Sequence, residues 1–124
     1  MQKWVMLLAG GVCGTAARYL LAGTVSRWLG TGFPYGTLTV NGIGCFVIGL
    51  LSSLAEQKFP MSPDLRLFWI VGLLGAFTTF STFIYESGRL LQNGELLPAL
   101  LNLQGSLAVG LLALWLGGRL GALL

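Results

Sequence analysis

Hydroxyl and phenyl side chains gather in residues 75–83, which read GAFTTFSTF. The hydroxyl residues of this cluster are Thr78, Thr79, Ser81 and Thr82. No charged residue lies between Arg66 and Glu86, so we expect the cluster at membrane depth. Backbone groups there must bond internally, unless an irregular segment is buried in protein or lines water. A packing seam would explain one or two hydroxyls, but four hydroxyls among three phenylalanines favour a polar pathway or ion site.

The polar residues expected within the membrane can all donate hydrogen bonds, which suits an anion. They are Asn41, Thr78, Thr79, Ser81, Thr82, Asn102 and Ser106. Phenyl rings have a positive edge and a negative face, so ring edges would favour an anion and ring faces a cation. Sequence alone leaves that orientation open, although the lack of an acid before Glu56 favours an anion. A small hydrated anion would need several donors, with binding weak enough for it to leave.

Enzymatic chemistry is not indicated, because the chain has no histidine and no nucleophile–base or carboxylate pair. Glu86 is the only acid near the hydroxyl cluster. Cys13 and Cys45 lie apart in apolar surroundings, without the spacing of metal ligands. We therefore expect no enzyme and no cysteine metal site.

The composition predicts an integral membrane protein. The chain has 124 residues, of which 55% are hydrophobic and 9% charged, and its mean hydropathy is +0.81. Soluble domains carry about 25% charged residues. A membrane span needs ~20 apolar residues, and four such stretches fit the length. Nothing suggests nucleic-acid binding, because the net charge of +3 is scattered.

We predict an all-α membrane protein with one domain, 1–124, and four helices at about 4–26, 36–55, 65–92 and 97–118. The first is expected to be a retained helix rather than a signal peptide. Ser62 and Asp64 are candidate caps of the third helix. Gly72 and Gly75 predict a local break near its middle, which would free backbone groups as in discontinuous transporter helices.

Three residues or motifs in these helices each leave two interpretations open. Gly10 and Gly14 form a GxxxG spacing, typical of close helix contact, within the chain or between subunits. Arg18 either extends toward the membrane surface or places a positive charge at an aqueous vestibule. Asn41 either makes an interhelical hydrogen bond or points its NH2 group into a pathway, because an unbonded buried amide costs free energy.

The basic residues give almost no preference for one membrane orientation. With four spans, one side holds Lys3, Lys58, Arg66 and Arg119. The other side holds Arg27 and Arg89, with Arg18 if its side chain extends that way. Such a chain could insert both ways, and four short helices have little room to enclose a pore alone. Both points favour a homodimer, in which two copies could pair antiparallel.

The chain resembles the CrcB/Fluc fluoride channels over nearly its whole length. The matching segments are GGVCGTAARY at 10–19, GTLTVNGIGCFVIG at 36–49 and GLLGAFTTFSTF at 72–83. The last two are specific in combination. This resemblance implies antiparallel dual-topology dimers with two fluoride pores, which export fluoride passively across a bacterial inner or plasma membrane.

The resemblance also implies roles for individual residues. Asn41 matches the pore asparagine, Phe80 and Phe83 match the phenylalanines whose ring edges line the fluoride track, and Ser81 and Thr82 match hydroxyls beside them. Gly75 and Thr78 match the break whose backbone carbonyls hold a central structural Na+. Arg18 matches the first-helix arginine and Glu86 the acid beyond the phenylalanines.

The fourth helix fits the family pattern less well. Asn102 and Ser106 could begin its polar ladder, but the next two positions are Gly110 and Leu114. Two other functions stay open. A proton-coupled four-helix transporter would require Glu86 to be essential, although Glu86 also suits a plain interfacial charge near Arg89. A non-conducting membrane subunit would tolerate any volume-preserving substitution at Asn41, Phe80 and Phe83.

Overall fold

The computed structural model describes residues 1–58 and 60–124, and their regular structure is entirely helical. Four helical stretches are long and apolar enough to cross a membrane. They are α1 (Gln2–Leu29), α2 (Tyr35–Gln57), the segmented stretch Pro63–Gln92, and α6 (Leu96–Leu123). The all-α fold with four potential spans, predicted from hydropathy, is confirmed.

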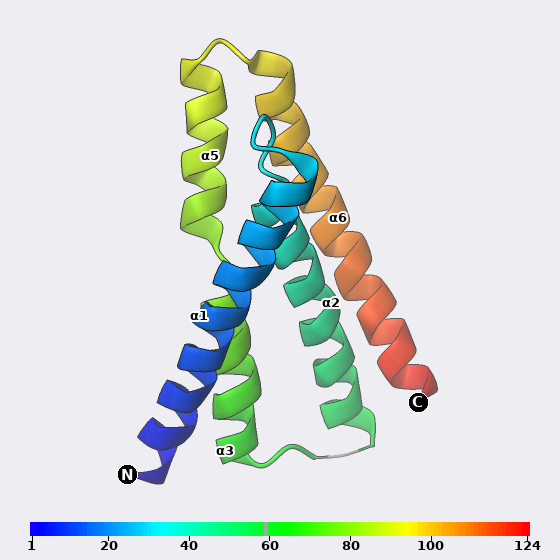
Figure 1. The fold of residues 1–124 in the computed structure, drawn as a ribbon. Coiled ribbons are helices and arrows are strands. Elements are labelled where there is room, and N and C mark those ends of the chain that lie inside the picture. The colour runs from blue at the N-terminus through cyan, green and yellow to red at the C-terminus, as the bar shows by residue number, and fades with distance from the viewer. Residues whose placement is uncertain (59) are drawn as a thin grey trace.

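The third stretch consists of four consecutive segments (Figure 1). They are α3 (Pro63–Arg66), the π-helix η1 (Leu67–Leu74), α4 (Gly75–Phe77) and α5 (Phe80–Gln92). Ser62 caps α3, because its hydroxyl accepts a hydrogen bond from the Leu65 N–H at 3.3 Å. Asp64 lies in the first turn rather than at the cap.

Observed helix bounds differ from the predicted ones mainly by extension. The first helix reaches Leu29 and the fourth reaches Leu123. Helical hydrogen bonding continues to these ends, where the Gly30 N–H bonds to the Ser26 carbonyl and the Leu124 N–H to the Leu120 carbonyl. The loop predicted at 56–64 is shorter in the structure, because its first two residues belong to α2 and its last two belong to α3. Phe59, within that loop, lies outside the described residues.

Glycines allow two helix pairs to approach closely. Gly10 and Gly14 of α1 face the backbone of η1, where a Cβ atom would collide with the carbonyls of Phe68 and Leu73. Gly117 of α6 is packed in the same way against the carbonyl of Phe46 on α2. The GxxxG spacing at Gly10 and Gly14 therefore serves a contact within the chain.

The outer surface is strongly apolar, with Trp28 85% exposed and Leu111 68% exposed, as a lipid-facing surface requires. Both termini lie at the same end of the molecule as the connection between α2 and α3 (Figure 1). The helix ends and connections that carry most of the basic residues therefore lie at the two ends of the molecule, whereas Arg18 lies within α1. The opposite end carries the α1–α2 connection and the turn between α5 and α6.

A candidate ion pathway at an interrupted helix

The helix interruption between α4 and α5 consists of two extended residues. Thr78 has φ −81° and ψ 157°, and Thr79 has φ −150° and ψ 118°. Helix α4 ends where the Thr78 N–H and hydroxyl both donate to the Leu74 carbonyl, at 3.0 and 2.9 Å. The extended pair lies just after the glycines at 72 and 75, within a stretch that is otherwise apolar enough to span a membrane.

Asn41 of α2 bonds both backbone polar groups of Thr79. Its Nδ2 donates to the Thr79 carbonyl at 3.0 Å, and its Oδ1 accepts from the Thr79 N–H at 2.8 Å. The amide thus pairs with the extended backbone as a neighbouring strand would. Asn41 makes the interhelical bond that was one of its two predicted roles. One Nδ2 proton is not used in this pair, and Asn41 also lines a cavity described below.

The carbonyls of Gly75 and Thr78 are among those at the interruption that lose the donors a continuous helix would give them. In an α-helix the N–H of residue i bonds to the carbonyl of residue i−4. The Thr79 N–H, which would bond to Gly75, bonds to Asn41 instead. The Thr82 N–H, which would bond to Thr78, bonds to the Thr79 hydroxyl at 3.3 Å. Gly75 and Thr78 are the residues whose carbonyls the family resemblance implies as ligands of a structural Na+, and this role stays a prediction.

Thr79 caps the start of α5 through its hydroxyl oxygen. Besides accepting from the Thr82 N–H, this oxygen donates to the Thr82 hydroxyl at 3.0 Å and lies 3.5 Å from the Ser81 hydroxyl. These contacts gather three of the four predicted hydroxyls at one helix end. Ser81 and Thr82 are exposed in the monomer, and their place in a pathway stays a prediction.

A cavity of about 470 Å³, here called the phenylalanine cavity, lies against the interruption. It brings together most of the predicted pathway and cation residues: Asn41, Gly75, Thr78, Phe80, Phe83 and Ser106. The rings of Phe80 and Phe83 have centroids 5.9 Å apart and are tilted by 52°. Phe83 is buried, whereas Phe80 is 74% exposed, so this cavity is open on the Phe80 side. Gly110 and Leu114 also line this cavity and add no polar side chain to it.

Asn102 lies behind this cavity rather than on its wall. It is 1% exposed and donates from Nδ2 to the Ser87 hydroxyl at 2.9 Å. Its Oδ1 accepts from the Ser106 hydroxyl at 3.4 Å. Sequence reasoning missed Ser87, because a single serine near a helix end is common and its partner is 15 residues away. Only the helical spacing of Phe83, Ser87 and Leu90 could have indicated that this face is buried.

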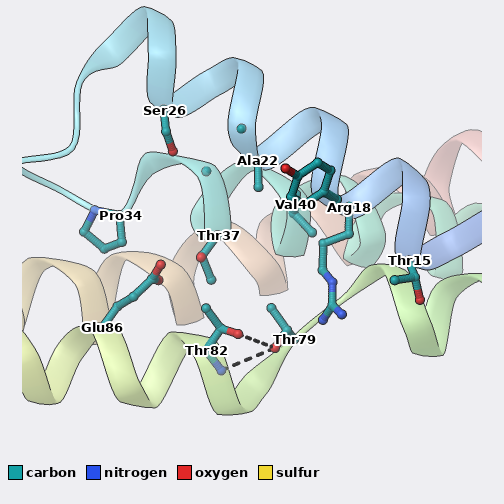
Figure 2. Close-up of a pocket in the computed structure, with 13 residues that line it drawn as sticks. Thr15, Arg18, Ala22, Ser26, Pro34, Thr37, Val40, Thr79, Thr82 and Glu86 are labelled. Atoms are coloured by element: carbon teal, nitrogen blue, oxygen red, sulfur yellow. Dashed lines mark hydrogen bonds between the residues drawn. The ribbon is translucent and has the colours of Figure 1, made fainter.

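A second cavity, of about 390 Å³, is here called the arginine cavity (Figure 2). Arg18 reaches into it from α1 toward Thr79, while Thr82 and Glu86 line it from α5. Glu86 Oε2 is buried and has no hydrogen-bond partner among the described residues. Thr79 lines both cavities, so the extended backbone forms the wall between them. Arg18 is half-buried at this cavity, and its role at a vestibule stays a prediction.

Fold and site together define a small multi-pass membrane protein with two mainly apolar cavities that share Thr79 at an interrupted helix. Residues 5–118 match the family described as CrcB-like protein, Camphor Resistance (CrcB). A relative from Hydrogenovibrio crunogenus, named fluoride-specific ion channel FluC, is 49% identical over 87% of this chain and 82% of its own. A relative of the same name from Maridesulfovibrio salexigens is 40% identical over 100% of this chain and 98% of its own.

A third relative of that name, from Geobacter sulfurreducens, is 50% identical over 86% of each chain. The chain therefore belongs to the CrcB family, and the resemblance recognised in its motifs is confirmed. The members just named are ion channels rather than enzymes.

Proposed function

We propose that this protein is a fluoride-selective channel that lets fluoride leave the cell passively. The observation that carries the proposal is the phenylalanine cavity, where an amide, two phenyl rings and hydroxyls meet at an interrupted membrane helix. Its relatives are named fluoride-specific ion channels. The membrane would be a bacterial inner membrane, because these relatives come from bacteria.

Fluoride would be held by several weak donors in turn. Asn41 has one N–H left after bonding Thr79, and the edges of Phe80 and Phe83 carry partial positive charge. The hydroxyls of Ser81, Thr82 and Ser106 would add donors along the track, with Asn102 behind Ser106. Replacing the hydration shell piece by piece gives selectivity without trapping the ion.

An antiparallel homodimer with two pores would complete these sites. Phe80 is 74% exposed in one chain although it lines the phenylalanine cavity. A second copy of opposite orientation would cover it and add donors to each track. The nearly equal distribution of basic residues between the two ends suits such dual topology.

A structural Na+ fits the interruption. The carbonyls of Gly75 and Thr78 have lost their helical donors to Asn41 and Thr79, and carbonyls of unwound helices are typical Na+ ligands. Two carbonyls do not fill a coordination shell, so the matching pair from a second copy would supply the rest. When bound, the ion would neutralise carbonyl dipoles at the centre of the dimer.

Arg18 and Glu86 would serve at the vestibule. The Arg18 guanidinium reaches into the arginine cavity, where it would attract anions toward the thin wall at Thr79. Glu86 favours a second candidate function, proton-coupled transport, because its Oε2 is buried in the same cavity without a hydrogen-bond partner among the described residues.

Fluoride efflux from liposomes that contain the purified protein tests the proposal. Chloride serves as the competing anion, with a potassium ionophore and no pH gradient. Rapid fluoride release without chloride release supports an uncoupled selective channel. Release only under a pH gradient would favour proton coupling through Glu86. No release under either condition, from a verified folded protein, would favour the non-conducting subunit.

A further inference from the structure

A chain of hydrogen bonds joins α5 and α6 behind the phenylalanine cavity. The Ser106 hydroxyl donates to Asn102 Oδ1 at 3.4 Å, and Asn102 Nδ2 donates to the Ser87 hydroxyl at 2.9 Å. Ser87 in turn donates to the Phe83 carbonyl at 2.8 Å. Asn102 and Ser87 are 1% and 2% exposed, whereas Ser106 lines the cavity. The chain therefore begins at the cavity wall and ends inside the protein.

The chemistry of the end groups fixes the direction of every bond in this chain. The Phe83 carbonyl can only accept, so it takes the single proton of Ser87. Ser87 can then only accept from Asn102, which turns the amide nitrogen toward Ser87 and the amide oxygen toward Ser106. Because an amide oxygen only accepts, Ser106 must be the donor. Its proton points to Asn102, and its lone pairs are left for the cavity.

The bond from Ser106 is the weakest member of the chain. The two inner bonds have ordinary lengths, whereas 3.4 Å is beyond the usual range for a hydroxyl donor. An anion that enters the cavity would need this proton and would compete with the Asn102 oxygen for it. When the anion accepts the hydrogen bond from Ser106 instead, the buried Oδ1 of Asn102 loses its only partner in this series of hydrogen bonds, which costs free energy.

We propose that Asn102, held in place by Ser87, is a positioning residue that competes with the passing anion for the Ser106 proton. The competition weakens anion binding at Ser106 and so speeds release of the anion from this position. This inference rests on the proposed fluoride channel and deepens it. Its distinctive consequence is that removing the competitor tightens fluoride binding.

The substitution Asn102→Leu removes the competing oxygen and keeps similar side-chain volume. The measurement is the fluoride efflux rate from liposomes over a range of internal fluoride concentrations. We expect the half-saturating concentration to fall about fivefold, as for one exchanged hydrogen bond, and the maximal rate to fall as well. Adding Ser106→Ala removes the donor, so the double variant should lose the tightening.

Because Asn102 is buried, a second variant leaves it in place. Ser87→Ala removes the acceptor of Nδ2, so the amide can turn its nitrogen to Ser106, and the Ser106 proton then faces the cavity. The half-saturating concentration should fall in the same direction, and Ser87→Thr should restore it by keeping the hydroxyl. Ser53→Ala is the matched control, since Ser53 is a buried serine of α2 that takes no part in the hydrogen bonds from Ser106 to Phe83.

An unchanged half-saturating concentration in folded Ser87→Ala protein would overturn the inference. A tightening that persists after Ser106→Ala would also overturn it, because the effect would then not pass through the Ser106 proton. Lack of fluoride release by the unmodified protein would instead overturn the proposed function, and this inference with it. If Asn102→Leu does not fold, the Ser87 series alone decides.

Discussion

At the residue scale, the two phenylalanines of the cavity differ in exposure but share one proposed task. Replacing either Phe80 or Phe83 by Ile keeps an apolar side chain and removes the ring edge. We expect fluoride efflux to fall about tenfold, the factor that corresponds to about 1.4 kcal/mol, while the protein stays folded. Phe46→Ile on α2 is the matched control, because Phe46 lines neither cavity. Normal efflux from both variants would contradict a pathway along the ring edges.

Asn41 has two proposed roles, to hold the interruption and to donate to the anion, and Asn41→Asp should affect both. Asn41→Asp replaces the N–H that bonds the Thr79 carbonyl with an oxygen, so two acceptors would face each other. The loss of this pairing should lower the free energy of unfolding by about 1–3 kcal/mol. A carboxylate would also repel anions, so efflux should stop.

Thermal unfolding in detergent and fluoride efflux test the two effects of Asn41→Asp separately. Asn93→Asp, in the exposed turn after α5, is the matched control for the added charge. Stability equal to that of the unmodified protein would mean that the Asn41–Thr79 pair does not hold the interruption in solution. Unchanged efflux would place Asn41 outside the pathway.

At the element scale, the start of α5 depends on one hydroxyl. Thr79→Val keeps the shape of the side chain but removes the oxygen that caps the Thr82 N–H. The expected loss of stability is about 1 kcal/mol, and Thr79→Ser should recover most of it. Thermal unfolding checks both variants. The control Thr24→Val removes an exposed hydroxyl that is bonded to its own helix. An equal loss of stability in this control would show that the effect of Thr79→Val does not come from the capping hydrogen bond.

The sequence predicts the helical stretches better than it predicts the contacts between them. Hydropathy and length specify four apolar stretches, and the glycines at 72 and 75 point to the segment where the third one is interrupted. An amide at Asn41 within an apolar helix must be bonded, but its partner Thr79 is 38 residues away. Nothing in local spacing identifies that partner.

Burial of polar groups was likewise hidden from the sequence. Asn102 and Ser106 stand four apart and share a helix face, which predicts that they meet but not which of them faces the cavity. The structure buries Asn102 because α5 brings Ser87 against it, and this depends on how two distant helices pack. Each cavity combines residues from three of the four long helical stretches, so no single stretch encodes it.

At the scale of the whole molecule, a single chain supplies only part of each proposed site. Phe80 is open on one side, and the freed carbonyls of Gly75 and Thr78 supply only part of a cation shell. In the proposed dimer, a second copy would complete both features at once. Cation binding and dimer assembly should therefore be coupled, because an ion that binds the dimer better than the monomer stabilises the dimer by mass action.

Replacing Na+ by a large organic cation, such as N-methylglucamine, at equal ionic strength should thus lower both the dimer fraction and the fluoride efflux rate. The large cation cannot enter between four carbonyls, whereas it screens surface charge as Na+ does. Size-exclusion chromatography with light scattering follows the dimer, and liposome efflux follows the channel. Recovery of both on returning Na+ would assign the effect to the ion. If the dimer fraction and the efflux rate do not change on this exchange, no Na+ is needed at the interruption. Asn41 would then be the principal support of the interruption.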